Sequence, residues 1–150
     1  MGGCATVVLG QLYDAGQNGA TRSATAKCEI LLVEDHESSA TITATVLRSF
    51  GHNVTVVGSV AAALEQFEGD RENPFDLVIS DLGLPDGSGE NLLQRLLARR
   101  PIKAIAVSGY GMESDVQKSA AAGFMAHLTK PINVTQLREA IARTLELESE

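Results

Sequence analysis

The stretch Glu29-Ile30-Leu31-Leu32-Val33-Glu34-Asp35 places an apolar run directly before two acids. A short continuous apolar run is typical of a strand that is buried on both faces of a parallel sheet. Parallel strands are joined by long crossover connections, usually helices, so short apolar runs and helical segments should alternate along the chain. The two acids would then stand where the strand ends, at the rim of the sheet.

The rest of the sequence follows this alternation. Four further strands are predicted, at residues 53–57, 75–80, 102–107 and 124–128. Helical segments follow the strands, and the one after the third strand is predicted to turn Leu92, Leu93, Leu96 and Leu97 inward. Five strands that alternate with five helices predict an α/β fold, an open doubly wound parallel sheet with helices on both faces. The binding site of such a sheet lies at the carboxyl ends of its strands.

Local propensity and apolar pattern conflict in the first predicted helix. Residues 41–46 are mostly β-branched, which favours a strand. The apolar face formed by Ala40, Ala44 and Leu47 favours a helix instead, and Gly51 stands where a C-terminal cap is needed. Because the segment is long, the helix is the preferred prediction.

Composition limits the class of protein. The chain has 150 residues, of which 44% are hydrophobic and 21% charged, as expected for one globular domain. Its formal net charge of -7 disfavours nucleic-acid binding, because the phosphate backbone attracts basic surfaces. The apolar runs are far shorter than the ~18 residues of a membrane span. Two cysteines, Cys4 and Cys28, are too few for a disulfide scaffold, so a reduced, cytoplasmic protein is predicted.

A change of composition near Lys27 divides the chain. Residues 1–27 are rich in Gly, Ala, Thr and Ser and are interpreted as a flexible leader or linker, residues 28–147 as the folded domain, and residues 148–150 as an acidic tail. Residues 1–6 also fit the loose N-myristoylation pattern. A plain leader is the preferred interpretation, because that pattern is short and common by chance.

Polar side chains follow four of the predicted strands at their carboxyl ends. Glu34 and Asp35 follow the first strand, Asp81 the third, Ser108 the fourth and Lys130 the fifth. Each alone has an ordinary explanation as a helix cap, a turn residue, a loop hydroxyl or a solvated amine, but together they share one rim. Two like charges ~4 Å apart repel by about 4 kcal/mol at an effective dielectric of 20. A raised carboxylate pKa, the Lys130 ammonium or a bound cation must offset this repulsion.

An acidic site made of oxygen ligands suits Mg²⁺, which keeps several waters and accepts phosphate oxygens. This preference points to phosphoryl chemistry, in which Lys130 would hold a phosphate oxygen and a carboxylate would act as the nucleophile. Asp81 is the best candidate nucleophile, because it follows the central strand and is itself followed by Gly83 and a turn at residues 85–87.

Four motifs together resemble a known family. They are Leu31-Leu32-Val33-Glu34-Asp35, Ser80-Asp81-Leu82-Gly83-Leu84-Pro85-Asp86-Gly87-Ser88-Gly89, Val107-Ser108-Gly109-Tyr110 and Lys130-Pro131. The ordered set is similar to the receiver domain of two-component response regulators, over about residues 28 to 147. The resemblance implies a flavodoxin-like sheet of five parallel strands in the order 2-1-3-4-5. Residues 108–112 also resemble receivers that are attached to hybrid sensor histidine kinases.

The resemblance implies a role for each acid at the rim. Asp81 matches the aspartate that takes a phosphoryl group from a kinase phosphohistidine. Glu34, Asp35 and Asp81 match the side chains that bind Mg²⁺, and the backbone carbonyl of Gly83 matches the further ligand two residues beyond the phosphoacceptor. The implied cofactor is therefore Mg²⁺.

The resemblance also implies roles for the residues at the ends of the fourth and fifth strands. Ser108 matches the hydroxyl that turns toward the phosphoryl group, and Lys130 matches the lysine that contacts it. The Lys130–Pro131 bond is implied to be cis. His127 stands where the family usually has a rotating aromatic residue, so a switch role and an ordinary strand residue are weighed equally there.

The implied partners are a histidine kinase or a histidine phosphotransfer protein. A downstream partner would read the face formed by the fourth helix, the fifth strand and the fifth helix. The chain would be a signalling phosphoacceptor rather than an enzyme, although it would assist its own phosphotransfer and dephosphorylation. The helix after Asn133 is expected to run almost to Glu150, which leaves no room for a DNA-binding module. A stand-alone regulator and a receiver of a larger protein both remain open.

Three alternatives are weighed against this interpretation. The first is a receiver-like interaction module that is never phosphorylated. The second is a phosphatase with an aspartate nucleophile, but such enzymes usually carry a second aspartate where this chain has Gly83. The third is a flavin or dinucleotide binder, but Glu34-Asp35-His36 replaces the glycine-rich phosphate loop expected after the first strand.

Overall fold

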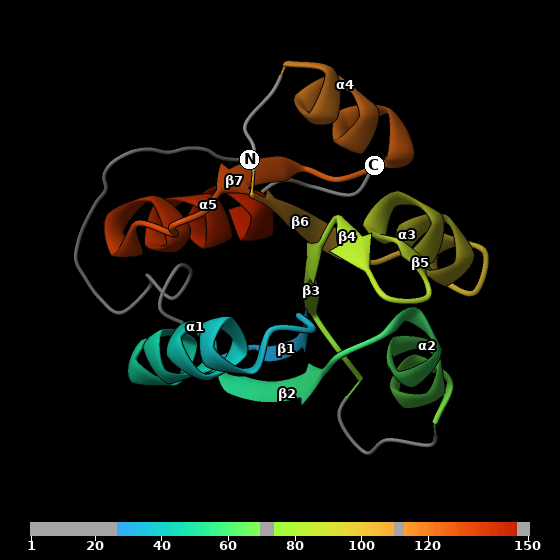
Figure 1. Cartoon of the computed structure of the whole chain (residues 1–150). Coiled ribbons are helices and arrows are strands. Elements are labelled where there is room, and N and C mark those ends of the chain that lie inside the picture. Colours follow the sequence, from blue (N-terminus) through green and yellow to red (C-terminus); the bar gives the residue numbers. More distant parts are fainter. Residues whose placement is uncertain (1–26, 70–73, 110–112, 147–150) are drawn as a thin grey trace.

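The computed structural model describes residues 27–69, 74–109 and 113–146. Helices and strands alternate through this part of the chain (Figure 1). In chain order they are β1 (Glu29–Val33), α1 (Glu37–Ser49), β2 (Asn53–Val57), α2 (Val60–Glu68), β3 (Leu77–Asp81), β4 (Gly83–Leu84), β5 (Gly87–Ser88), α3 (Gly89–Leu97), β6 (Lys103–Ser108), α4 (Glu113–Ala122), β7 (Ala126–Thr129) and α5 (Val134–Glu146).

Five of the strands form one parallel sheet in the order β2-β1-β3-β6-β7. In terms of the five predicted strands this is the order 2-1-3-4-5, so the predicted fold class and strand order are confirmed. The short strands β4 and β5 pair antiparallel as a separate hairpin, which the sequence pattern indicated only as a turn. The third and fourth strands each end one residue later than predicted, so Asp81 and Ser108 are themselves the last residues of β3 and β6.

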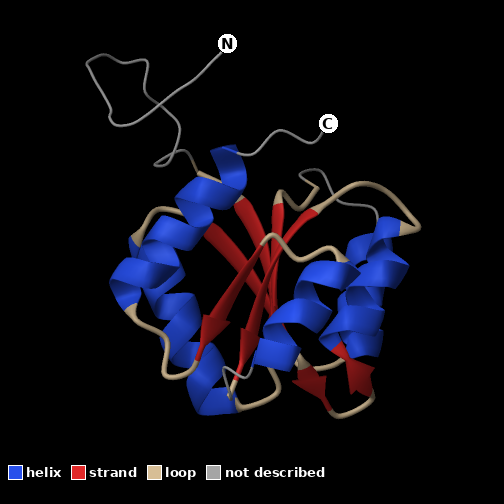
Figure 2. Cartoon of the chain, turned by 90° about the horizontal axis from the view of Figure 1, so that it is seen from above, coloured by secondary structure: helices blue, strands red, loops and turns tan. Residues whose placement is uncertain are grey.

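Two layers of helices cover the sheet. Helices α1 and α5 lie on one face, and α2, α3 and α4 lie on the other (Figures 1 and 2). Successive side chains of a strand point to opposite faces, so each strand contributes side chains to the core on both faces of the sheet. In β1, Ile30 and Leu32 join the core under α1 and α5, whereas Leu31 and Val33 join the core under the other three helices. The alternation explains why the strand sequences are continuously apolar.

The segment of conflicting propensity folds as helix α1. Its buried side chains are Ala40, Thr43, Ala44 and Leu47. Its exposed side includes Ile42, which is 65% exposed. Burial of one face therefore outweighs the β preference of the branched residues, because tertiary packing contributes more than local propensity.

One residue of α3 departs from the prediction. Leu92, Leu93 and Leu96 are buried, but Leu97 is 39% exposed, so its predicted inward position is wrong. At 100° per residue, Leu97 lies about 40° outside the arc that the other three leucines cover. It packs beside Gly123, where an added Cβ would approach its Cδ1 to 3.1 Å.

The hairpin after β3 is held to helix α2 by Asp86. Its carboxylate accepts hydrogen bonds from the backbone N–H groups of Val60 at 2.8 Å and Ala61 at 3.0 Å. These are free donors of a helix N-terminus, and the two bonds lower the pKa of Asp86. The Asp86 contact thus fixes the segment that directly follows Asp81.

His52 connects the end of α1 to the start of β1 from within the core. The residue is 4% exposed, and its Nδ1 accepts a hydrogen bond from the backbone N–H of Cys28 at 3.1 Å. Burial lowers the pKa of His52, because the charged imidazolium is poorly solvated there. The unfolded chain therefore takes up a proton at this residue at a higher pH than the folded chain does.

This difference predicts a pH-dependent stability. The contribution of His52 is fully present above its unfolded pKa of about 6.5 and is lost as the pH falls through the lower folded pKa. Urea unfolding should be measured at about pH 7.5 and at about pH 5.5. From the higher to the lower pH, the unfolding free energy should fall less for His52→Asn than for the wild type. An equal loss in both proteins would show that another group causes the dependence.

Candidate functional site

The carboxyl ends of β1, β3, β6 and β7 bring the candidate site residues to one rim. Val33 pairs with Ser80, Asp81 with Val107, and Ser108 with Thr129 in the parallel register. The residues that end or follow these strands are consequently neighbours. Four strands deliver acidic, hydroxyl and amine groups to the same edge of the sheet.

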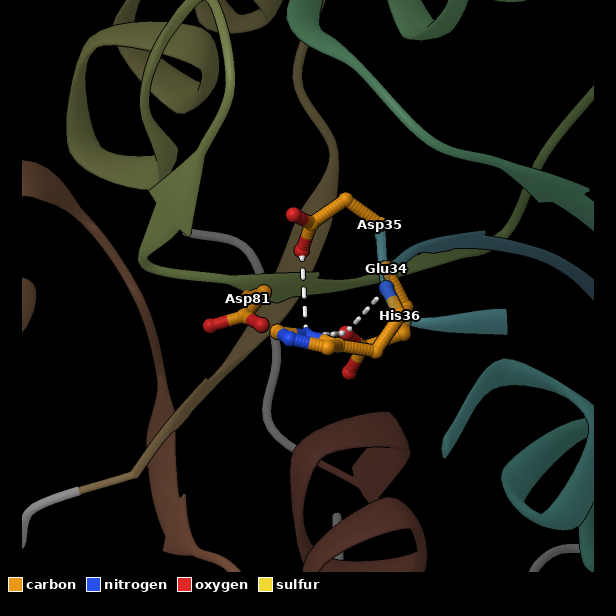
Figure 3. Close-up of side chains that lie close together, drawn as sticks. All are labelled: Glu34, Asp35, His36 and Asp81. Atoms are coloured by element: carbon orange, nitrogen blue, oxygen red, sulfur yellow. Dashed lines mark hydrogen bonds and ion pairs between the residues drawn. The ribbon is translucent and has the colours of Figure 1, made fainter. Parts of the chain in front are cut away.

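Three acids and one histidine form a cluster at this rim. They are Glu34, Asp35, His36 and Asp81, and one ligand atom of each lies within 4.8 Å of the others. Figure 3 shows Asp81 beside the three residues that follow β1. Glu34 and Asp81 are only 7% and 8% exposed, whereas the side chain of Asp35 is 31% exposed. The cluster thus has a buried side and an open side.

Lys130 joins the two buried acids. Its Nζ lies 2.7 Å from Glu34 Oε1 and 3.0 Å from Asp81 Oδ2. Burial alone would lower the pKa of Lys130, but hydrogen bonds and charge from Glu34 and Asp81 outweigh it, so the pKa is raised. The side chain therefore stays an ammonium and offsets the repulsion between the two carboxylates.

The backbone around Lys130 fixes where its side chain starts. Its N–H donates to the carbonyl of Ser108 at 2.8 Å, which continues the pairing of β6 with β7 by one residue. The Lys130–Pro131 peptide bond is cis. Because Lys130 directly follows β7, its amine approaches Asp81 from the carboxyl end of that strand, at the same edge of the sheet.

His36 is a member of the cluster that the sequence interpretation left without a role. Its backbone N–H donates to Glu34 Oε2 at 3.1 Å, and its Nδ1 lies 3.5 Å from both Glu34 Oε2 and Asp35 Oδ1. The signal in the sequence was its position directly after the acidic pair. Its position is equally that of an ordinary helix-start residue, so position alone does not indicate a role in the site.

Gly89 packs against the backbone of Asp81. A Cβ built on Gly89 would lie 2.5 Å from the Asp81 carbonyl oxygen and 3.1 Å from Leu82 Cα. Gly83, in β4, is exposed and would meet nothing within 4 Å; its N–H donates to Asp81 Oδ1 at 3.3 Å. Position 89 therefore requires glycine for space, a constraint that the sequence alone did not reveal.

Ser108 lies on the opposite side of the rim from the acidic pair, against His127. The Ser108 Oγ and His127 Nε2 atoms are 2.8 Å apart, and Ser108 is 6% exposed. His127 also lines a hollow of about 550 Å³ between β7 and α5, which is separate from the acidic cluster. The structure therefore brings Ser108 and His127 together, as a pair distinct from the carboxylates.

The donor set fits a hard divalent cation. Carboxylate oxygens from Glu34, Asp35 and Asp81 come from two adjacent strands and converge within reach of one another. Mg²⁺ takes oxygen ligands of this kind and retains waters at the open side of a site. Gly83 lies two residues past Asp81 at the exposed end of the same segment.

Comparison with known proteins identifies the family. Residues 30–142 match the family model described as the response regulator receiver domain. This chain belongs to the receiver domain family. Receiver domains are signalling domains, and the match covers both acidic strand ends, Ser108 and Lys130.

The curated relatives are longer than the part that this chain matches. The receiver is 38% identical over 114 residues to the sensory transduction protein RegX3 of Mycolicibacterium smegmatis, covering 76% of this chain and 47% of that protein. It is 33% identical over 109 residues to the two-component response regulator ORR26 of Oryza sativa subsp. japonica, covering 73% and 19%. The chain thus spans less than half the length of these relatives.

Solved structures share the architecture. A CheY-like response regulator receiver domain protein from Methanospirillum hungatei JF-1 superposes with a TM-score of 0.72 at 30% identity, covering 81% of this chain and 95% of that one. The receiver domain of the sensor histidine kinase PA1611 from Pseudomonas aeruginosa PAO1, which holds a magnesium ion in its active site cleft, gives 0.72 at 29% identity, covering 81% and 100%. Among the helices that the structure of the present receiver describes, none has the length and apolar character that a bilayer crossing requires.

The packing of Gly89 against the Asp81 backbone predicts that alanine substitutions at two glycines differ strongly in their effect on stability. Gly89→Ala should lower the unfolding free energy by about 1–3 kcal/mol, because the new methyl group displaces the Asp81 backbone. Gly83→Ala, its matched control, should unfold close to the wild type, because its Cβ points into open space. Chemical denaturation of the three proteins measures both effects. Equal stability of the two variants would contradict the packing argument.

Proposed function

We propose that this receiver accepts a phosphoryl group on Asp81 from the phosphohistidine of a histidine kinase or a histidine phosphotransfer protein, and so acts in a two-component phosphorelay. The observation that carries the proposal is the Lys130 ammonium, which lies 3.0 Å from the Asp81 carboxylate at the end of the central strand. The family match supports the same role.

In the proposed step one carboxylate oxygen of Asp81 attacks the phosphorus atom. The new O–P bond forms while the N–P bond of the donor breaks, and the donor imidazole leaves with the bonding electron pair. Lys130 stands where it can hold a phosphoryl oxygen as negative charge moves toward Asp81. Gly83, whose N–H donates to Asp81 Oδ1, orients the carboxylate for attack.

Glu34, Asp35 and Asp81, with the backbone carbonyl of Gly83, are the proposed ligands of Mg²⁺. When bound, the ion would neutralise charge on the phosphoryl oxygens. The converging carboxylates of this chain support that assignment, as does the magnesium ion in the cleft of the related PA1611 receiver. The buried position of Glu34 and its bonds to Lys130 and His36 preorganise the acidic side of the site.

We further propose that phosphorylation changes the face formed by α4, β7 and α5. A phosphoryl group carries a charge of roughly -1.5 to -2 and new acceptor oxygens. Ser108 and Lys130 can contact the phosphoryl oxygens in that state alone, so these added contacts favour one of two arrangements of the surrounding segments. His127, which bonds to Ser108 and lies on β7, connects the rim to that face, where a downstream partner would bind.

The proposed domain comprises residues 28–147, with a leader at residues 1–27 and an acidic tail at residues 148–150. Residues 1–26 and 147–150 lie outside the described part of the chain. A cytoplasmic location is proposed because the kinase partner would be there. The net charge of -7 supports a protein partner rather than nucleic acid.

The phosphoacceptor assignment predicts the site of modification. Incubation with acetyl phosphate and Mg²⁺ should add one phosphoryl group to the wild type and none to Asp81→Asn, as measured by intact-protein mass spectrometry. Asp76→Asn is the matched control, because Asp76 precedes β3 whereas Asp81 ends it. Failure of the wild type to take up phosphate, also from a panel of histidine kinases, would favour the phosphorylation-independent interaction module.

The metal assignment predicts a ligand-dependent stability. Mg²⁺ should raise the Tm of the wild type, because a ligand that binds the folded state stabilises it. Asp35→Asn should lose most of this rise, since it removes an anionic ligand from the open side of the cluster. Glu65→Gln, an exposed acid on α2, should respond to Mg²⁺ as the wild type does. A full Mg²⁺ response in Asp35→Asn would overturn the ligand assignment.

A further inference from the structure

We propose that Ser119 of α4 is a positioning residue that fixes the tautomer of His127 and thereby holds the hydroxyl proton of Ser108 away from Asp81. The proposal rests on the proposed function, because Ser108 matters through its reach to a phosphoryl group on Asp81. It adds a hydrogen-bonded connection, Ser119–His127–Ser108, that runs from a helix into the phosphoacceptor rim.

The proton of Ser119 is committed to the backbone of its own helix. Its Oγ donates to the carbonyl of Val116 at 2.9 Å. A serine hydroxyl has one proton, so the same oxygen can act only as an acceptor toward a second partner. That partner is His127 Nδ1, at 3.1 Å. Nδ1 must therefore carry the proton of the neutral ring.

The other nitrogen of the ring follows from this assignment. A neutral imidazole has one donor and one acceptor nitrogen, so His127 Nε2 is the acceptor. Ser108 Oγ lies 2.8 Å from Nε2 and is then the donor. Ser119 and Ser108 are 2% and 6% exposed, so water competes poorly for either hydroxyl. Both serines hold the ring in one tautomer.

This arrangement sets a competition for one proton. To donate to a phosphoryl oxygen on Asp81, Ser108 must give up its bond to His127, which leaves Nε2 without that donor. The loss of this bond affects the ring's other hydrogen bond, to Ser119, and therefore acts on helix α4, which carries that serine. Without the Ser119 hydroxyl the ring can adopt the other tautomer, in which Nε2 donates to Ser108 Oγ and leaves the Ser108 proton available.

The first test needs no phosphodonor. Long-range ¹H–¹⁵N NMR of the full chain should show the wild-type His127 ring neutral and protonated at Nδ1. In Ser119→Ala this preference should be lost, with Nε2–H becoming the major form. Thr144→Val is the matched control: Thr144 is 1% exposed and lines the same hollow as His127, and within the described structure its Oγ1 has no hydrogen-bond partner. This control should keep the wild-type tautomer.

The second test measures the consequence at the rim. With Mg²⁺ present, beryllofluoride, a mimic of the phosphoryl group, should bind Ser119→Ala about two- to tenfold more tightly than the wild type, the effect of one net hydrogen bond. Thr144→Val should bind it as the wild type does. An imidazolium or an Nε2–H ring in the wild type, an unchanged tautomer in Ser119→Ala, or equal or weaker beryllofluoride binding by that variant would overturn the proposal. A wild type that binds no beryllofluoride would instead contradict the role of Asp81, and the tautomer measurement would still decide the role of Ser119.

Discussion

Burial of two carboxylates beside a single ammonium is the constraint on which this rim depends. Glu34 and Asp81 are almost fully buried, and Lys130 bonds to both. Removal of one partner from a buried ionic group costs about 3–5 kcal/mol, because the remaining charge is left uncompensated. In the proposed reaction Glu34 and Asp81 would also bind Mg²⁺, and Lys130 would also hold a phosphoryl oxygen. The charges that stabilise this site are therefore the same ones that are proposed to bind the metal ion and the phosphoryl group.

The sequence predicted this constellation because it follows from strand pattern alone. Continuous apolar runs mark parallel strands, and the carboxyl ends of parallel strands meet at one edge. Glu34, Asp81, Ser108 and Lys130 each end or directly follow such a run, so their proximity needs no knowledge of side-chain packing. The helix α1 was predictable for a similar reason, since its buried face repeats at helical spacing despite its β-branched residues.

The parts that the sequence did not predict depend on how separate elements dock. The close approach of Gly89 to the Asp81 backbone exists only once α3 packs against β3. The contact between Ser119 and His127 joins a helix to a strand and depends on the rotation of α4 about its own axis. Leu97 lies at the margin of an apolar arc, where one packing partner decides exposure. No periodicity encodes these distances.

The contacts that hold the Asp81 backbone in place indicate which neighbouring groups can respond to a change of charge. Gly89 blocks its backbone from behind, and Asp86 ties the following hairpin to α2. If Asp81 is phosphorylated as proposed, a backbone held in this way would stay in place, and the response would fall to side chains that rotate. Lys130 and Ser108 reach the rim through rotatable bonds, and Ser108 in turn contacts His127. A rigid Asp81 backbone beside rotatable partners would therefore direct a change of charge at Asp81 toward β7 and α4 rather than into the sheet.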